Sequence, residues 1–158
     1  MTIEFHNVTQ ENLAAVCALQ VAPEQRELVT SNVMTMAESQ FEAGALVRAL
    51  WLNDHPVGLL AMLNPSRYPT DQDIIIRRDT AFVWRLMVGL EYQGQGFGMQ
   101  ALTEAKRIAI TWGYNAMSLT VGGKTHSAIP MYEKFGLSRT GRILWDDENE
   151  IEMLCRFT

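Results

Sequence analysis

The 158-residue sequence has few of the residues that disulfide-bonded and metal-binding proteins need. Its two cysteines, Cys17 and Cys155, form no CxxC pair, and their spacing indicates no disulfide framework. Its three histidines, His6, His55 and His126, are far apart and show no HExxH or i,i+4 spacing. Because metal ligands recur at such spacings, the sequence predicts no metal site. We expect a protein of a reducing compartment.

Long apolar runs and basic clusters are also missing. No apolar run approaches the roughly 18 residues that a membrane-spanning helix needs. The polar, mildly acidic N-terminus does not resemble a signal peptide. The formal net charge of −5 argues against a nucleic-acid partner and favours cationic small molecules. These absences predict a cytoplasmic protein with no membrane and no nucleic-acid partner.

What the sequence does contain fits one small globular domain. Hydrophobic residues make up 47% of the chain and charged residues 20%, which is ordinary for a globular protein. The length suits a single domain over residues 1–158 that buries about 70% of its unfolded surface. No repeat, low-complexity stretch or linker interrupts it.

Hydrophobic periodicity predicts secondary structure in the order β-α-α-β-β-β-α-β-α-β-β. The expected strands cover residues 3–8, 46–52, 57–63, 81–88, 117–121, 139–145 and 150–157. The expected helices cover residues 10–19, 23–43 with a break near 31–32, 99–112 and 128–135. Thr9 is the expected cap of the first helix. Residues 64–80 are expected to form a polar loop, in which Ile74, Ile75 and Ile76 have no assigned place.

The most informative segment is the run Q-G-Q-G-F-G at residues 93–98, between an expected strand and an expected helix. At such a junction, backbone N–H groups and the helix dipole favour an anion, and glycine allows the anion to approach closely. The spacing matches neither the G-x-G-x-x-G dinucleotide fingerprint nor a P-loop. The segment therefore predicts a loop that holds the phosphates of another cofactor.

The spacing that does fit is Q/R-x-x-G-x-G/A, met by Gln93, Gly96 and Gly98. The segment 121–137, V-G-G-K-T-H-S-A-I-P-M-Y-E-K-F-G-L, adds a second pattern. Both resemble motifs of the GNAT N-acetyltransferase superfamily, whose architecture the order of elements matches over essentially the whole chain. The resemblance implies an α/β (α+β) fold: a mixed, mostly antiparallel sheet of about seven strands, flanked by helices and splayed at the central strands.

The resemblance also implies acetyl-CoA as cosubstrate and direct transfer of its acetyl group to a primary amine. Tyr132 would then protonate the departing CoA thiolate as general acid, although a tyrosine packed in the core explains that residue alone. Thr125 stands where the family usually has asparagine. The implied cofactor-binding residues are Met87, Val88, Gln93, Gly94, Gln95, Gly96, Phe97, Gly98 and Thr125.

A finer resemblance concerns the acceptor. The run Pro23-Glu24-Gln25, with residues 84–88 and 92–98, resembles bacterial spermine/spermidine (diamine) acetyltransferases, which implies a polyamine acceptor. A polyamine needs carboxylates spaced along a groove, and the expected acceptor-binding residues are Glu24, Glu42 and Trp84. Carboxylates scattered over an acidic surface explain the glutamates equally well. The family resemblance is also compatible with a homodimer.

The base that removes the amine proton is left unassigned. Trp84 and Arg85 stand where several polyamine-acetylating relatives carry glutamate and aspartate. Glu38, Glu42, Glu91 or a chain of waters remain open as replacements. Two alternatives to a polyamine acetyltransferase also remain. One is an acetyltransferase for an amino acid, an aminoglycoside or a protein N-terminus; the other is a catalytically weak CoA-binding regulatory module.

Overall fold

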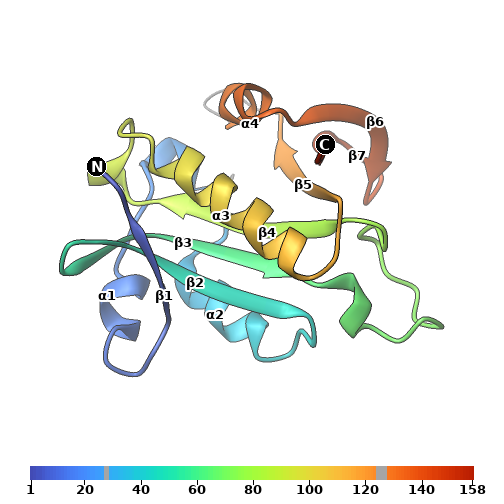
Figure 1. The fold of residues 1–158 in the computed structure, drawn as a ribbon. Helices are drawn as coiled ribbons and strands as arrows, with labels where there is room; N and C mark the ends of the chain where they lie inside the picture. Colours follow the sequence, from blue (N-terminus) through green and yellow to red (C-terminus); the bar gives the residue numbers. More distant parts are fainter. Residues whose placement is uncertain (27–28, 124–127) are drawn as a thin grey trace.

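A computed structural model describes residues 1–26, 29–123 and 128–158. Its strands form a seven-stranded sheet in the order β1-β2-β3-β4-β5-β7-β6 (Figure 1). Neighbouring strands are antiparallel except for the parallel pair β4–β5. The strands are β1 (Glu4–Asn7), β2 (Ala45–Leu52), β3 (His55–Leu63), β4 (Ala81–Val88), β5 (Ala116–Gly122), β6 (Ser138–Leu144) and β7 (Asp147–Arg156).

Helices cover both faces of this sheet (Figure 1). They are α1 (Leu13–Cys17), α2 (Asn32–Ser39), α3 (Phe97–Thr111) and α4 (Ile129–Phe135), with 3-10 turns at Pro23–Gln25, Pro65–Arg67 and Leu90–Tyr92. α1 and α2 lie on one face, and α3 lies on the other. The order of elements that the sequence predicted, and the mixed, mostly antiparallel sheet, are confirmed. In the described part of the chain, no helix is both long and apolar enough to cross a membrane.

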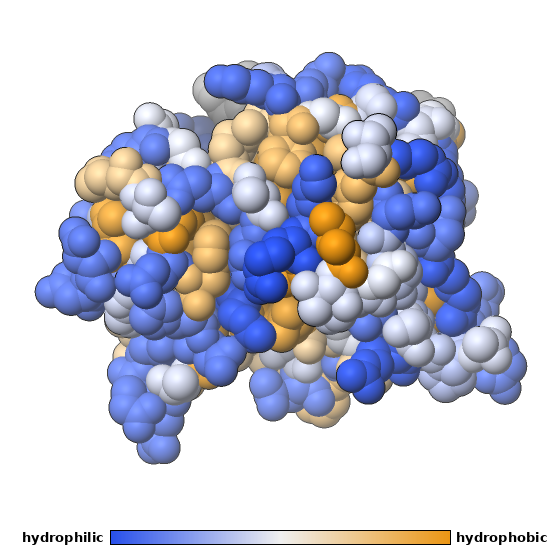
Figure 2. Space-filling model, in the orientation of Figure 1, coloured by the Kyte–Doolittle hydropathy of each residue, from blue (hydrophilic) through white to orange (hydrophobic). Residues whose placement is uncertain are grey.

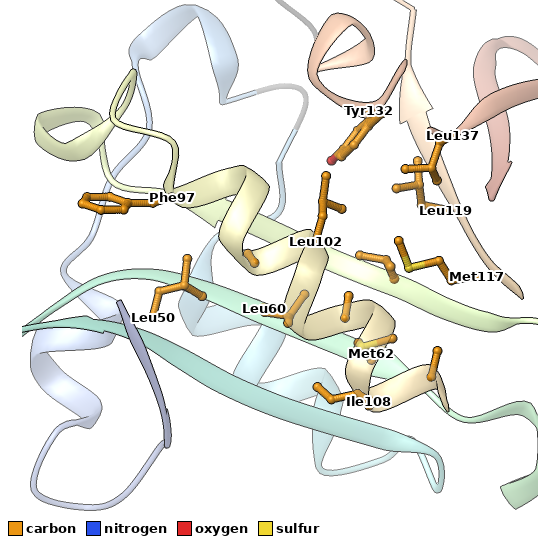
Figure 3. Packing of buried hydrophobic residues seen from close by; sticks show 14 of the residues in the cluster. Leu50, Leu60, Met62, Phe97, Leu102, Ile108, Met117, Leu119, Tyr132 and Leu137 are labelled. Carbon is orange, nitrogen blue, oxygen red and sulfur yellow. The ribbon is translucent and has the colours of Figure 1, made fainter. Parts of the chain in front are cut away.

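The core is divided by the sheet because side chains alternate between its faces. Leu59 of β3 packs with Val16 of α1 in a small cluster on the α1 face. Its neighbour Leu60 and the next alternate residue, Met62, belong to the larger cluster under α3. Figure 3 shows these two side chains and Leu102 of α3 in that cluster. The outward side of α3 is mostly hydrophilic in Figure 2, as an amphipathic helix requires.

The first two expected helices are shorter than the sequence predicted, and local polar bonds explain their starts. α1 begins at Leu13, and the Thr9 side chain does not cap it; instead the Thr9 backbone N–H donates to Asn12 Oδ1 (2.7 Å). The break near 31–32 is confirmed, because Ser31 Oγ accepts the N–H of Met34 (3.2 Å) and caps α2. Such bonds satisfy backbone N–H groups in the first turn of a helix or just before it, and so fix where the helix starts.

The two central strands separate, as the resemblance implied. β4 and β5 pair at Ala81–Met117, Phe82–Ser118 and Val83–Leu119, and the ladder ends there. Beyond that point β4 continues to Val88 and β5 to Gly122 without pairing to each other, and Figure 1 shows the two strands diverging. Because peptide groups removed from water need partners, the open edge of β4 is suited to receive a ligand that carries amides.

Candidate active site

A cavity of about 1170 Å³ runs along β4, from residue 82 to residue 88. The segment that follows β4 forms one end of it, the glycine end, with Gln93, Gly94 and residues 96–99 on the wall. The loop that precedes β4 forms the other end, the loop end, with Tyr68, Gln72, Ile74, Ile75 and Ile76 on the wall. Residues 119–122 of β5 and Tyr132 of α4 also border the cavity.

At the glycine end, two glycines are required by backbone conformation. Gly94 has φ 77° and Gly96 has φ 85°, both in the left-handed region that side chains disfavour. A Cβ at either position would meet nothing within 4 Å, so open space lies beside the loop. Gly98 is different, because its Cβ would lie 2.6 Å from Met131 Sδ of α4. Gly98 therefore allows α4 to approach α3 closely.

The N-terminus of α3 also faces this end of the cavity. Gly96 is its N-cap residue, and among the described residues no side chain caps the first turn. Because the first N–H groups of a helix lack internal partners, they remain available to an anion. The glycine end thus combines free N–H groups, a helix dipole and open space.

A side-chain brace, which the sequence did not reveal, holds the start of this loop. Gln93 Nε2 donates to the carbonyl oxygen of Val88 (2.9 Å), the last residue of β4, and to Gln25 Oε1 (3.0 Å). Gln25 Oε1 also accepts the backbone N–H of Ala22 (3.0 Å). Both amide donors of Gln93 are therefore used to position the loop. Gln95 is exposed and does not border the cavity.

A β-bulge changes the direction of side chains in the middle of β4. Val83 pairs with Met62 and Arg85 pairs with Ala61, so Trp84 is the extra residue on β4. Consecutive residues of a regular strand point to opposite faces. The bulge instead lets the Arg85 guanidinium lie 4.4 Å from the centre of the Trp84 ring, and both side chains border the cavity. A bulge beside a cavity is a common way to redirect side chains.

Tyr132 lies where its hydroxyl can face the cavity. The residue is 8% exposed, and Figure 3 shows its ring projecting from α4 with the hydroxyl toward α3. Among the described residues the hydroxyl has no hydrogen-bond partner. Burial raises the pKa of Tyr132 to about 12. The hydroxyl is therefore protonated at neutral pH and is available as a donor.

The residues expected to bind the acceptor are only partly brought together. Glu42 and Trp84 border the cavity, whereas Glu24 is exposed and does not. Glu42 Oε2 accepts a hydrogen bond from the Tyr68 hydroxyl (2.6 Å). The pKa of Tyr68 is raised, mainly by burial and to a smaller extent by this bond. Of the other carboxylates considered as a base, Glu38 Oε2 lies 3.4 Å from Arg85 Nη2, and Glu91 is exposed away from the cavity.

The structure describes only part of what is needed to judge the Thr125 cofactor contact and the expected absence of a metal site. Thr125 and His126 lie outside the described residues. Within residues 1–26, 29–123 and 128–158, no group of three histidine, cysteine, aspartate or glutamate side chains is placed to hold a metal ion.

Comparison with known proteins shows the family. The model of the acetyltransferase (GNAT) family matches residues 11–137, and the chain belongs to this family. It is accordingly an acetyltransferase with acetyl-CoA as cosubstrate. No curated protein matches the sequence.

Solved structures share the fold at low sequence identity. The PaiA N-acetyltransferase from Thermoplasma acidophilum, in complex with coenzyme A, is 16% identical with a TM-score of 0.70 over 99% of this chain and 100% of that one. A GNAT family acetyltransferase from Elizabethkingia anophelis with acetyl-CoA bound is 16% identical, with a TM-score of 0.63 over 98% of each chain. The ribosomal-protein-S18-alanine N-acetyltransferase from Escherichia coli is 19% identical, with a TM-score of 0.68 over 99% and 95%. At these identities the similarity shows the fold alone.

Proposed function

We propose that this protein transfers the acetyl group of acetyl-CoA directly to a primary amine bound at the loop end of the cavity. The observation that carries the proposal is that one cavity is bordered by the left-handed glycine loop, the open edge of β4 and the Tyr132 hydroxyl. A module that only binds CoA would need the glycine loop and the open edge of β4, but not the tyrosine hydroxyl. A buried tyrosine whose hydroxyl has no partner among the described residues adds a proton donor.

The glycine end is suited to the pyrophosphate of acetyl-CoA. Residues 93–98 would hold it through backbone N–H groups at the start of α3, with Gly94 and Gly96 in the conformations that expose those groups. The pantetheine arm would lie along β4, where its amides can pair with the peptide groups of Met87 and Val88. Thr125 keeps its proposed cofactor contact from the resemblance alone. Gln95 would contribute through its backbone, because its side chain is exposed.

The chemistry is a single displacement at the thioester carbonyl. The neutral amine nitrogen forms a bond to the carbonyl carbon, the carbon–sulfur bond breaks, and the sulfur receives a proton from Tyr132. The tyrosine is then reprotonated from solvent. Of the three carboxylates considered as the base, Glu42 borders the cavity, and we propose that it takes the amine proton directly or through water.

A polyamine is the first acceptor to test, because the sequence resemblance points to it. The cavity wall carries two carboxylates, Glu42 and Glu150, together with two cations, Arg85 and Lys134. Trp84 is proposed to line the path of the acceptor. A protein N-terminal amine is the second candidate. It is supported by the shared fold of the ribosomal-protein-S18-alanine N-acetyltransferase, although that similarity concerns the fold alone.

The test is release of CoA thiol from acetyl-CoA by the purified chain. The amines are spermidine, spermine, putrescine, lysine, an aminoglycoside and a peptide that begins with alanine. Saturable turnover of any of them supports acetyl transfer to a primary amine, and the preferred one identifies the acceptor. A chain that binds acetyl-CoA tightly but turns over no amine would instead be a CoA-binding regulatory module.

A further inference from the structure

Ile74, Ile75 and Ile76, here called the isoleucine segment, have no part in the cofactor site described above. They lie in the irregular loop between β3 and β4, yet all three border the loop end of the cavity. Ile75 keeps 37% of its surface exposed. Branched apolar side chains exposed to a cavity favour contact with an apolar group of a ligand. The segment therefore offers a surface that the cofactor alone does not explain.

An arginine clamp fixes the loop before the isoleucine segment. Arg78 Nη2 donates to the carbonyl oxygens of Pro69 (2.7 Å) and Gln72 (2.6 Å), and Arg78 Nη1 donates to that of Tyr68 (3.4 Å). One guanidinium thus closes the loop on itself through backbone groups. The loop has a defined shape without belonging to a helix or strand.

A buried carboxylate ties the same loop to the C-terminal strands. Glu152 of β7 is 3% exposed and receives hydrogen bonds from Arg77 Nη2 (2.9 Å), Arg142 Nη1 (3.0 Å) and Thr140 Oγ1 (2.6 Å). Arg142 Nη2 also donates to the carbonyl oxygen of Ile75 (2.9 Å). The isoleucine segment is therefore held by a network of charge-assisted bonds, which are the stronger kind.

The charges on the cavity wall are few and balanced. Among the described residues that border the cavity, the charged side chains are Glu42, Glu150, Arg85 and Lys134. Glu42 already accepts the hydrogen bond of Tyr68. A polycation gains affinity from several unopposed carboxylates along its path. This wall instead places Arg85, whose guanidinium is paired with Glu38 (3.4 Å), beside Trp84 of the same strand.

We infer that the isoleucine segment determines acceptor specificity, and that the acceptor is a primary amine carried on an apolar body that packs against it. This inference rests on the proposed function, because it concerns the amine that receives the acetyl group. Arg77, Arg142 and Glu152 are positioning residues for this wall. The amine itself is directed toward β4, and the hydrocarbon faces away from the glycine end.

The test compares amines of matched length and different charge at saturating acetyl-CoA. Butylamine, hexylamine and octylamine form one series, and putrescine is the doubly charged match of butylamine. We expect kcat/KM to rise about threefold to fourfold for each methylene that the wall buries, and butylamine to be turned over at least as well as putrescine. A flat response to chain length, or a clear preference for putrescine, would overturn the inference.

Ile75→Ser tests the wall itself, since Ile75 is partly exposed and the loop is fixed by backbone bonds. We expect this variant to lose most of the gain in kcat/KM between butylamine and octylamine. Ile110→Ser is the control, because Ile110 is 53% exposed on α3 and does not border the cavity. Turnover of polyamines or peptides without turnover of alkylamines would reject the apolar acceptor and keep acetyl transfer. Tight acetyl-CoA binding without turnover of any amine would reject both proposals.

Discussion

The two ends of the cavity are built in different ways. The glycine end comes from one continuous stretch, residues 93–99, and its geometry lies in backbone conformations such as those of Gly94 and Gly96. The wall outside the glycine end is assembled from segments far apart in the chain, with Ile75 from the loop before β4, Glu42 from the segment before β2 and Trp145 from the turn after β6. On the functions proposed above, the cofactor would be bound by one short motif, whereas the acceptor would be selected by side chains from several distant segments.

The largest effect is expected when a side chain is added at the glycine end. In Gly96→Val the new side chain would project into the open space beside the loop, where we place the pyrophosphate. We expect the Kd for acetyl-CoA, measured by calorimetry, to rise at least about 100-fold, a loss of about 2.7 kcal/mol.

Gly113→Val is the matched control for backbone strain. Gly113 has φ 92° and open space beside it, like Gly96, but it does not border the cavity. Both valines adopt a disfavoured conformation at a cost of about 1–3 kcal/mol, so both variants should lose similar stability. Equal loss of acetyl-CoA binding in both would show that strain, and not the occupied space, weakens binding.

Tyr132→Phe separates catalysis from cofactor binding. We expect kcat to fall by about 100-fold while the Kd for acetyl-CoA stays within about twofold, since only a hydroxyl is removed. Tyr114→Phe is the control, because the Tyr114 hydroxyl donates to Asn64 Oδ1 (2.9 Å) and lies away from the cavity. A drop in both variants would mean that a general loss of packing, and not proton donation, limits the rate.

The pH dependence of kcat also tests the proposal that Tyr132 is the general acid. Burial raises the pKa of Tyr132 to about 12, so its protonated form persists above the ordinary tyrosine range. We therefore expect any loss of kcat through ionisation of this hydroxyl to begin well above pH 10. A loss of kcat centred at the ordinary tyrosine pKa would contradict this expectation, because it would mean that the Tyr132 hydroxyl is exposed to water during the reaction.

At the loop end, Glu152→Gln should have the largest effect on stability. It leaves Arg77 and Arg142 without a carboxylate, and we expect the free energy of unfolding at pH 7 to fall by about 1–3 kcal/mol. Glu104→Gln is the control, because its partner Arg107 is 64% exposed, and a change within about 0.5 kcal/mol is expected. Urea denaturation of the three proteins measures both differences.

The difference in stability between wild type and Glu152→Gln should also depend on pH. Burial alone would raise the pKa of Glu152, but hydrogen bonds from Arg77 and Thr140 and the charges of Arg77 and Arg142 outweigh it and lower the pKa. A lowered folded-state pKa contributes stability above the unfolded-state pKa, and this is lost as the pH falls through the folded value. The gap between wild type and Glu152→Gln should therefore be full at pH 7 and shrink below about pH 4. A gap that persists in acid would mean that the carboxylate charge is not what stabilises the loop.

Local patterns explain how much of the molecule could be predicted. β4 occupies residues 81–88 as expected, and the glycines after it begin α3, because both depend on neighbouring residues. The bonds from Gln93 to Gln25 and from Arg77 to Glu152 join residues 68 and 75 positions apart. Side-chain pairs at such separations leave no periodicity in the sequence. The sequence assigns no place to the isoleucine segment for a related reason. Its loop is held by the nearby Arg78 and by the distant Arg142 through backbone carbonyl groups, and such bonds produce neither a helical nor a strand pattern.

The smallest predicted effect tests whether even the glycine end depends on such a distant pair. Gln25→Leu removes the oxygen that accepts from Gln93 Nε2, while the bond from Gln93 to the Val88 carbonyl remains. One hydrogen bond contributes about 0.5–1.5 kcal/mol, so we expect the Kd for acetyl-CoA to rise about twofold to tenfold through looser positioning of the loop.

Gln95→Leu, at an exposed residue of the same loop, should leave the Kd unchanged. If Gln95→Leu weakens binding and Gln25→Leu does not, the Gln95 side chain contacts the cofactor and the brace is dispensable. If the expected order holds, the backbone motif is sufficient for recognising the family but not for full affinity, because part of that affinity comes from a glutamine 68 residues away.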